Sequence, residues 1–206
     1  MDLTTLSKCY KKLIVFDSKY VMYYKKLKLD FNPFDKLPEH YYQIEDKTLK
    51  VWNKYIDTAD FNKNTRDWFI KNNLFLKSSV IFTYMPDAVC PIHVDGFNTN
   101  EYDYRQFTAI NFTMGGQGSM QWFEPTGEIP IDPLHTKVAK SPFVMYDETM
   151  SKLDSTYIGT DPTLVRVDVP HRGTNMSDQT RHSITLRWLP KLTWEEAQKK
   201  FKPFFL

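Results

Sequence analysis

The sequence predicts an α+β fold that is mainly β, with helices first, a sandwich or barrel of short strands next, and one helix at the end. The prediction rests on a change of pattern near residue 78. Apolar residues recur at helical spacing before it, and short β-branched and aromatic runs separated by turn signals follow it. The length of 206 residues favours one domain, 1–206. We divide it into a helical part (1–78), a β core (79–190) and a C-terminal helix (191–206).

Two helices are expected in the first part. The segment 47–57 carries apolar residues at helical spacing. The segment 64–76 is the second candidate, in which Thr65 is the expected cap and Trp68 and Phe69 are the expected buried residues.

Six segments of the second part have the composition of strands. They are 79–84, 107–114, 119–123, 143–146, 164–169 and 183–188. The second and third of these flank the glycine-rich sequence Gly115–Gly118, which is typical of a hairpin. Thr193 and Glu196 have the spacing of a capping box, which predicts the start of the C-terminal helix.

Composition narrows the class of protein. A formal net charge of +2 is too small to argue for a nucleic-acid partner. No run is long and apolar enough for a membrane span, and residues 1–15 lack the apolar stretch of a signal peptide. The two cysteines, Cys9 and Cys90, provide no disulfide framework and suit a reducing compartment. We therefore expect a cytoplasmic protein without a membrane partner; the sequence does not indicate an oligomeric state.

Three residues have the chemistry of a metal site. His93 and Asp95 are two apart, so on an extended backbone their side chains point to the same face. His171 follows the strand 164–169 and is expected to close the site from across the barrel. Two histidines and one carboxylate leave open positions on the metal, which suits non-haem Fe(II). Cys90 lies three residues before His93, so a zinc site remains the lesser alternative.

The strand near residue 185 has one polar face and one mostly apolar face. The residues of the polar face are Arg181, Ser183, Thr185 and Arg187; those of the other face are His182, Ile184, Leu186 and Trp188. If the apolar face packs on the helices, the polar face lines the barrel interior. Buried arginine is costly without an anion, and a ligand dicarboxylate is a natural partner. Two alternatives stay open: the arginines pair with Asp or Glu elsewhere, or this face is solvated.

Taken together, these motifs resemble the Fe(II)/2-oxoglutarate-dependent dioxygenase superfamily. Its pattern is H-x-D/E, then a distal His, then Arg or Lys about ten residues on, often as R-x-S. This sequence has His93-Val-Asp95, then His171, then Arg181-His-Ser183, and the resemblance covers roughly residues 79–188. It implies a double-stranded β-helix, a jelly-roll or cupin-like fold, with the N-terminal helices packed on its major sheet.

The resemblance also implies a reaction and its cofactors. It implies that His93, Asp95 and His171 bind Fe(II) and are catalytic, and that O2 and 2-oxoglutarate are co-substrates. Arg181 would bind the distal carboxylate of 2-oxoglutarate, with Ser183 assisting. The expected reaction is oxidative decarboxylation of 2-oxoglutarate coupled to hydroxylation of an amino-acid, peptide or small-molecule substrate.

Other residues are candidates from their positions in strands or in the loop that follows the metal motif. Asn111 and Arg187 are further candidate contacts of 2-oxoglutarate, and Arg187 stays an alternative to Arg181 as its main carboxylate ligand. Tyr84 and Trp122 are candidate walls of the interior. In the loop 97–106, Tyr102 and Arg105 are candidates for substrate recognition.

Two other functions stay open. The alternation Arg181-x-Ser183-x-Thr185-x-Arg187 also resembles the R-x-N-x-T-x-R of AlkB-like demethylases, which act on nucleobases. A cupin-like metal-binding module without 2-oxoglutarate is the other alternative, and it would need no buried Arg181 beside the metal. The sequence does not identify the substrate.

Overall fold

The computed structural model describes residues 23–46, 48–96, 106–125, 133–135, 142–146 and 151–206. Most of the regular structure in these residues is β. The strands are β1 Tyr24–Lys26, β2 Val51–Ile56, β3 Phe75–Tyr84, β4 Ile92–Asp95, β5 Thr108–Gly115, β6 Ser119–Pro125, β7 Pro133–His135, β8 Pro142–Tyr146, β9 Ser151–Ile158, β10 Thr163–Arg166, β11 His171–Gly173 and β12 Arg181–Leu189. The helices are α2 Lys63–Lys71 and α3 Trp194–Phe201, with short 3-10 helices η1 Glu39–Tyr42, η2 Thr58–Asp60 and η4 Lys202–Phe204.

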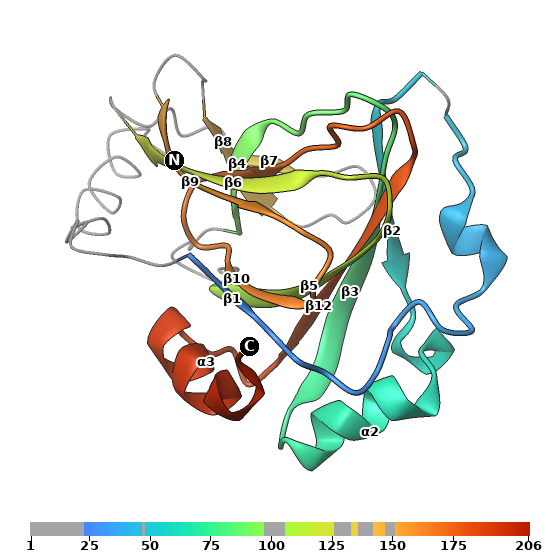
Figure 1. The fold of residues 1–206 in the computed structure, drawn as a ribbon, viewed down its shortest axis with the longest axis vertical. Coiled ribbons are helices and arrows are strands. Elements are labelled where there is room, and N and C mark those ends of the chain that lie inside the picture. Colours follow the sequence, from blue (N-terminus) through green and yellow to red (C-terminus); the bar gives the residue numbers. More distant parts are fainter. Residues whose placement is uncertain (1–22, 47, 97–105, 126–132, 136–141, 147–150) are drawn as a thin grey trace, which may run out of the picture.

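The strands form two six-stranded sheets that enclose the interior (Figure 1). The major sheet has the order β1-β10-β5-β12-β3-β2, and the minor sheet has the order β7-β8-β4-β11-β6-β9. All paired neighbours are antiparallel. Each sheet places strands from distant parts of the chain side by side. This arrangement is that of a cupin-like jelly roll, and it confirms the predicted fold class.

Both helices cover the outer face of the major sheet (Figure 1). Trp68 of α2 stacks on Phe201 of α3 with ring centroids 5.9 Å apart. Phe69 lies 6.0 Å from the ring of Trp188, which belongs to the apolar face of β12. Each such buried side chain contributes about 1.5–3 kcal/mol relative to an exposed one. The apolar face of β12 therefore packs on the helices, as expected, and its polar face is left for the interior.

The expected helix over 47–57 is wrong, because the chain forms β2 there and pairs with β3. Val51 and Ile56 are β-branched, and aromatic residues lie between them, so the composition suits a strand. The apolar spacing alone fits either structure, and the open edge of β3 provides the partner.

The second helix is confirmed as α2, but its ends differ from the expectation. The cap is Asn62, whose side chain accepts a hydrogen bond of 2.9 Å from the backbone N–H of Thr65. Thr65 itself is buried inside the first turn. The helix ends at Lys71, and the residues from Phe75 onward belong to β3. The predicted capping box at Thr193 is present at the start of α3.

The expected hairpin between β5 and β6 is wrong, because the two strands lie in different sheets. The sequence Gly115–Gly118 carries the chain from the major to the minor sheet. Gly115 has φ +86°, a conformation that favours glycine. At Gly118 a Cβ would overlap the carbonyl oxygen of Thr174 and would lie 2.8 Å from Cδ of Arg181. The glycines permit this close crossing rather than a hairpin turn.

In the described part of the chain, no helix has the length and apolar character needed to cross a membrane.

Gly118→Ala tests the crossing. We expect it to lower the free energy of unfolding by about 1–3 kcal/mol, because the added methyl must displace both the Thr174 backbone and the Arg181 side chain. Chemical denaturation measures the change. The neighbouring exposed Gln117→Ala is the control and should stay within about 0.5 kcal/mol of the parent. Equal stability of the two variants would contradict the crowded geometry.

Candidate metal centre

Two neighbouring strands of the minor sheet bring the three candidate ligands together. His93 and Asp95 share one face of β4. His171 begins β11 and is directly opposite His93 in the register of the two strands. The third residue therefore comes from the adjacent strand, and the expectation that it reaches the site from across the barrel is wrong.

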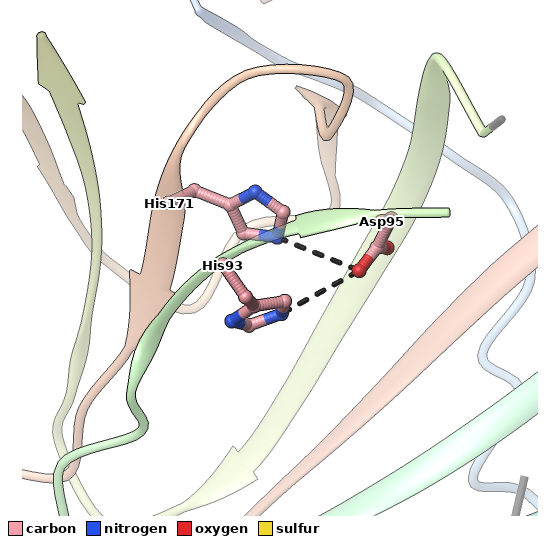
Figure 2. Close-up of side chains that lie close together, drawn as sticks. All are labelled: His93, Asp95 and His171. Carbon is pink, nitrogen blue, oxygen red and sulfur yellow. Dashed lines mark ion pairs between the residues drawn. The ribbon is translucent and has the colours of Figure 1, made fainter. Parts of the chain in front are cut away.

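The side chains converge on one point (Figure 2). Nε2 of His93 lies 3.4 Å from Oδ1 of Asp95, and Nε2 of His171 lies 3.9 Å from the same oxygen. All three candidate ligand atoms lie within 4.8 Å of one another, so they could hold one metal ion. Among the residues that the structure describes, no other such group of three occurs, and Cys90 is not a member of this one. The geometry therefore does not support the C-x-x-H zinc alternative.

The backbone sets the tautomer of both histidines. Nδ1 of His93 lies 2.9 Å from the carbonyl oxygen of Pro91, and Nδ1 of His171 lies 2.9 Å from that of Val169. A carbonyl oxygen only accepts, so each Nδ1 is the protonated donor. Each Nε2 then presents its lone pair to the site. Metal-ligating histidines are usually oriented by such a hydrogen bond.

The charges of the site are those that a cation requires. Burial raises the pKa of Asp95, but the Arg187 guanidinium and both imidazoles outweigh it and hold this pKa well below its usual range. Burial and the neighbouring His93 lower the pKa of His171 to about 4. Burial also opposes the charged form of His93, but its hydrogen bond with Asp95 outweighs burial and raises its pKa. At neutral pH, Asp95 is therefore charged and His171 is neutral.

A buried ion pair joins the major sheet to this site. Nη2 of Arg187 donates to Oδ2 of Asp95. The register of β12 with β3 shifts between Leu186 and Trp188, where two residues of β3 are opposite the single residue Arg187. For Arg187, the structure therefore shows the first alternative left open by the sequence, in which an arginine of the polar face pairs with a carboxylate of the protein. The Nε of Arg187 has no hydrogen-bond partner in the described residues.

Arg181 lies at the other end of the polar face and is 6% exposed. Its Nη1 donates a hydrogen bond of 2.9 Å to the carbonyl oxygen of Thr174. Its guanidinium lies 5.2 Å from the centroid of the Tyr84 ring. The hydroxyl of Tyr84 approaches Gly173 so closely that a Cβ there would lie 2.5 Å from it. Tyr84 thus spans from the major to the minor sheet beneath Arg181.

Asn111 is held by two neighbours. The hydroxyl of Thr185 donates to Oδ1 of Asn111 over 2.9 Å. Nδ2 of Asn111 donates to the thioether sulfur of Met120 over 3.4 Å. The first bond identifies which end of the amide is the oxygen, so the amide N–H faces Met120.

The interior between the sheets contains a cavity of about 60 Å³. All seven sequence-predicted site residues line it, namely His93, Asp95, Asn111, His171, Arg181, Ser183 and Arg187.

Of the two candidate walls, Tyr84 lines the cavity as expected. Trp122 is not among the lining residues; its ring stacks with those of Tyr23 and Tyr24. Met120 and Cys90 also line the cavity and were not predicted from the sequence; the position of Met120 in a strand was the available signal. Tyr102 and Arg105 lie outside the described residues.

Comparisons with known proteins do not assign an activity. No protein-family model matches the sequence, and no curated protein matches it. Similar solved structures include an oxalate oxidase in complex with glycolate (11% identity, TM-score 0.36, 83% of this chain and 76% of that chain). A second is a cupin-like protein from Thermotoga maritima (15% identity, TM-score 0.32, 74% of this chain and 85% of that chain). A third is the ribosomal oxygenase YcfD of Escherichia coli (12% identity, TM-score 0.29, 54% of this chain and 24% of that chain). At these identities and TM-scores, the similarity carries no argument about function.

Metal binding should depend on pH through His93. Its raised pKa means that the metal must displace a proton from it below that pKa, whereas His171 and Asp95 are already deprotonated at neutral pH. Affinity should therefore rise with pH until His93 is deprotonated, with release of about one proton per metal ion at the acidic end of that range. Calorimetry in buffers of different ionisation enthalpy counts the protons. Release of two or more near neutral pH would contradict the neutral state of His171.

Arg187→Met should destabilise the metal-free protein by about 3–5 kcal/mol, because it leaves the buried Asp95 carboxylate without its partner. A bound divalent cation supplies the missing charge, so added metal should raise the melting temperature of this variant more than that of the parent. Arg166→Met is the control, since its pair with Asp168 is partly exposed and should be worth about 0–1 kcal/mol. Equal metal-induced shifts in all three proteins would contradict the role of the ion pair.

Proposed function

We propose that this chain is a non-haem Fe(II)/2-oxoglutarate-dependent oxygenase. It would couple the oxidative decarboxylation of 2-oxoglutarate to hydroxylation of an amino-acid, peptide or small-molecule substrate. One observation carries the proposal. Two imidazole nitrogens and one carboxylate converge on a cavity that is also lined by two buried arginines, Arg181 and Arg187.

The donor set fits Fe(II). Two neutral imidazoles and one carboxylate give a charge of −1 and leave coordination positions for other ligands, which distinguishes the set from a closed structural zinc site. The Nδ1 bonds to Pro91 and Val169 fix both imidazole rings. Arg187 holds the second oxygen of Asp95, which leaves Oδ1 toward the histidines. Bound Fe(II) would supply the oxygen-binding and redox chemistry of the reaction.

Arg181 is the better candidate for the distal carboxylate of 2-oxoglutarate. Arg181 and Arg187 are six residues apart on one strand, about 20 Å along its axis. A five-carbon diacid is much shorter than this separation, so it could contact both guanidinium groups only if the two arginine side chains pointed toward each other. Arg187 already bonds to Asp95, whereas Arg181 bonds to a neutral carbonyl and lies over a ring. Burial keeps the pKa of Tyr84 well above its ordinary value, and its neutral phenol is hydrogen-bonded to Cys90 beside Arg181. Ser183 would assist Arg181.

The size of the cavity favours one second candidate. A volume of about 60 Å³ is well below the ~300–1,000 Å³ of typical ligand pockets, so 2-oxoglutarate binding would require lining side chains to move. A cupin-like metal enzyme that acts on a smaller ligand, without 2-oxoglutarate, needs no such movement.

Anaerobic spectroscopy separates the two candidates. Fe(II) with 2-oxoglutarate should give a weak visible charge-transfer band, and admission of air should release succinate. Metal binding without the band and without succinate would rule out the oxygenase and leave the second candidate. A succinate-release screen over amino acids, peptides and methylated nucleobases then distinguishes the substrate classes.

Arg181→Met should weaken 2-oxoglutarate binding by about tenfold to a hundredfold, the loss expected for one charged hydrogen-bonding group, and leave metal affinity unchanged. Titration of the charge-transfer band measures both. Arg172→Met is the matched control, because Arg172 pairs with Gln121 on the neighbouring strand and does not line the cavity. Unchanged co-substrate affinity in Arg181→Met would instead point to Arg187.

A further inference from the structure

The loop between β11 and β12 is organised around one buried side chain, that of Asn175. It is 1% exposed and does not line the cavity. Its Nδ2 donates to the carbonyl oxygens of Tyr84, Met85 and Gln179 over 3.2, 3.0 and 2.7 Å. Its Oδ1 accepts from the backbone N–H and the hydroxyl of Ser177 over 3.3 and 3.0 Å. Carbonyl oxygens only accept, so the amide has one possible orientation, and it ties the loop to the end of β3.

Asn175 also fixes the peptide unit that joins it to Thr174. Its backbone N–H donates to the carbonyl oxygen of Ala88 over 2.7 Å. In a trans peptide the N–H and the C=O point in opposite directions, so the Thr174 carbonyl is directed away from Ala88. Nη1 of Arg181 donates to this carbonyl oxygen over 2.9 Å. The direction of the acceptor that holds Arg181 is therefore set by the contacts of Asn175.

The side chain of Arg181 is enclosed by groups that Asn175 holds in place. Cδ and Nε of Arg181 pass so close to Gly118 that a Cβ there would lie 2.8 and 2.9 Å from them. The guanidinium lies 5.2 Å from the centroid of the Tyr84 ring. The backbone carbonyl of Tyr84 is one of the three acceptors of the Asn175 amide. Two of the groups around the guanidinium, the Tyr84 ring and the Thr174 carbonyl, are thus connected through Asn175.

We propose that Asn175 is a positioning residue for the co-substrate, which keeps Arg181 oriented toward the distal carboxylate of 2-oxoglutarate. This inference rests on the proposed function. The Thr174 carbonyl is neutral, so it orients the guanidinium without cancelling the charge that the carboxylate requires. A long side chain that is ordered before binding loses less conformational entropy when the ligand arrives. For one such side chain, the difference corresponds to about three- to tenfold in affinity.

A double-mutant cycle tests whether Asn175 acts through Arg181. Asn175→Ala should weaken 2-oxoglutarate binding about three- to tenfold, as measured by titration of the charge-transfer band of the Fe(II)-loaded full chain. The same substitution in an Arg181→Met background should change the affinity by less than about 1.5-fold, because the guanidinium that it positions is absent. Equal losses in the two backgrounds overturn the inference.

Turnover kinetics distinguish positioning from a purely structural role. In Asn175→Ala the KM for 2-oxoglutarate should rise about three- to tenfold, whereas kcat at saturating 2-oxoglutarate and the metal affinity should stay within about twofold of the parent. A purely structural role would reduce the fraction of folded protein, and with it kcat, at an unchanged KM. That result would contradict the inference.

Asn62→Ala is the matched control, because Asn62 also ties a loop through its amide. Its Nδ2 donates to the carbonyl oxygens of Asn32 and Asp35 over 2.8 and 3.2 Å, and its Oδ1 caps α2. It lies with α2 on the outer face of the major sheet (Figure 1). This variant should lose stability but keep the parent's affinity for 2-oxoglutarate. A loss of affinity equal to that of Asn175→Ala overturns the inference.

Ser177→Ala decides the question if Asn175→Ala does not fold. It removes the hydroxyl that donates to Oδ1 of Asn175 and accepts from the N–H of Gln117, and it leaves the three carbonyl bonds of Asn175 in place. We expect an affinity loss of about twofold that disappears in the Arg181→Met background. An unchanged affinity, or the same loss in both backgrounds, overturns the inference.

The parent protein separates this inference from the proposed function. A charge-transfer band and succinate release in the parent, without coupling between Asn175 and Arg181, overturn the inference and leave the oxygenase intact. Absence of both the band and succinate in the parent overturns both.

Discussion

The ion pair between Arg187 and Asp95 connects the two halves of this structure. Arg187 belongs to β12 in the centre of the major sheet, and Asp95 belongs to β4 in the minor sheet. Both side chains are about nine-tenths buried. Such a pair contributes little net stability, but loss of one partner leaves a buried charge at a cost of about 3–5 kcal/mol. The two sheets are therefore held in the one relative position in which these charges meet.

The position of Asp95 follows from this pair, and the chemistry of the site follows from Asp95. Arg187 and the two imidazoles together overcome the effect of burial on the pKa of Asp95 and keep the carboxylate ionised. The carboxylate in turn raises the pKa of His93, while burial and His93 lower that of His171. One negative charge and two imidazoles of different basicity are thus arranged around a single point. A cation at that point would neutralise a charge that the fold already stabilises.

Period-two alternation explains which parts of the site could be predicted from sequence. It places His93 beside Asp95, and it places Arg181 and Arg187 on the inward face of one strand, because the alternation is a local property of the backbone. The identity of the partner strand is not local. The expected hairpin at Gly115–Gly118 failed for that reason, since the turn instead connects two sheets. The expected helix over 47–57 is wrong because this segment pairs with β3 as strand β2, and the local sequence does not indicate that partner.

Co(II) titration shows whether Asp95, His93 and His171 bind one metal ion in an open site. We expect saturation at about one Co(II) per chain, with the weak visible absorption of a five- or six-coordinate ion with N and O ligands. Asp95→Ala should abolish saturation. Intense tetrahedral bands with sulfur-to-metal charge transfer, lost in Cys90→Ser but retained in Asp95→Ala, would contradict it.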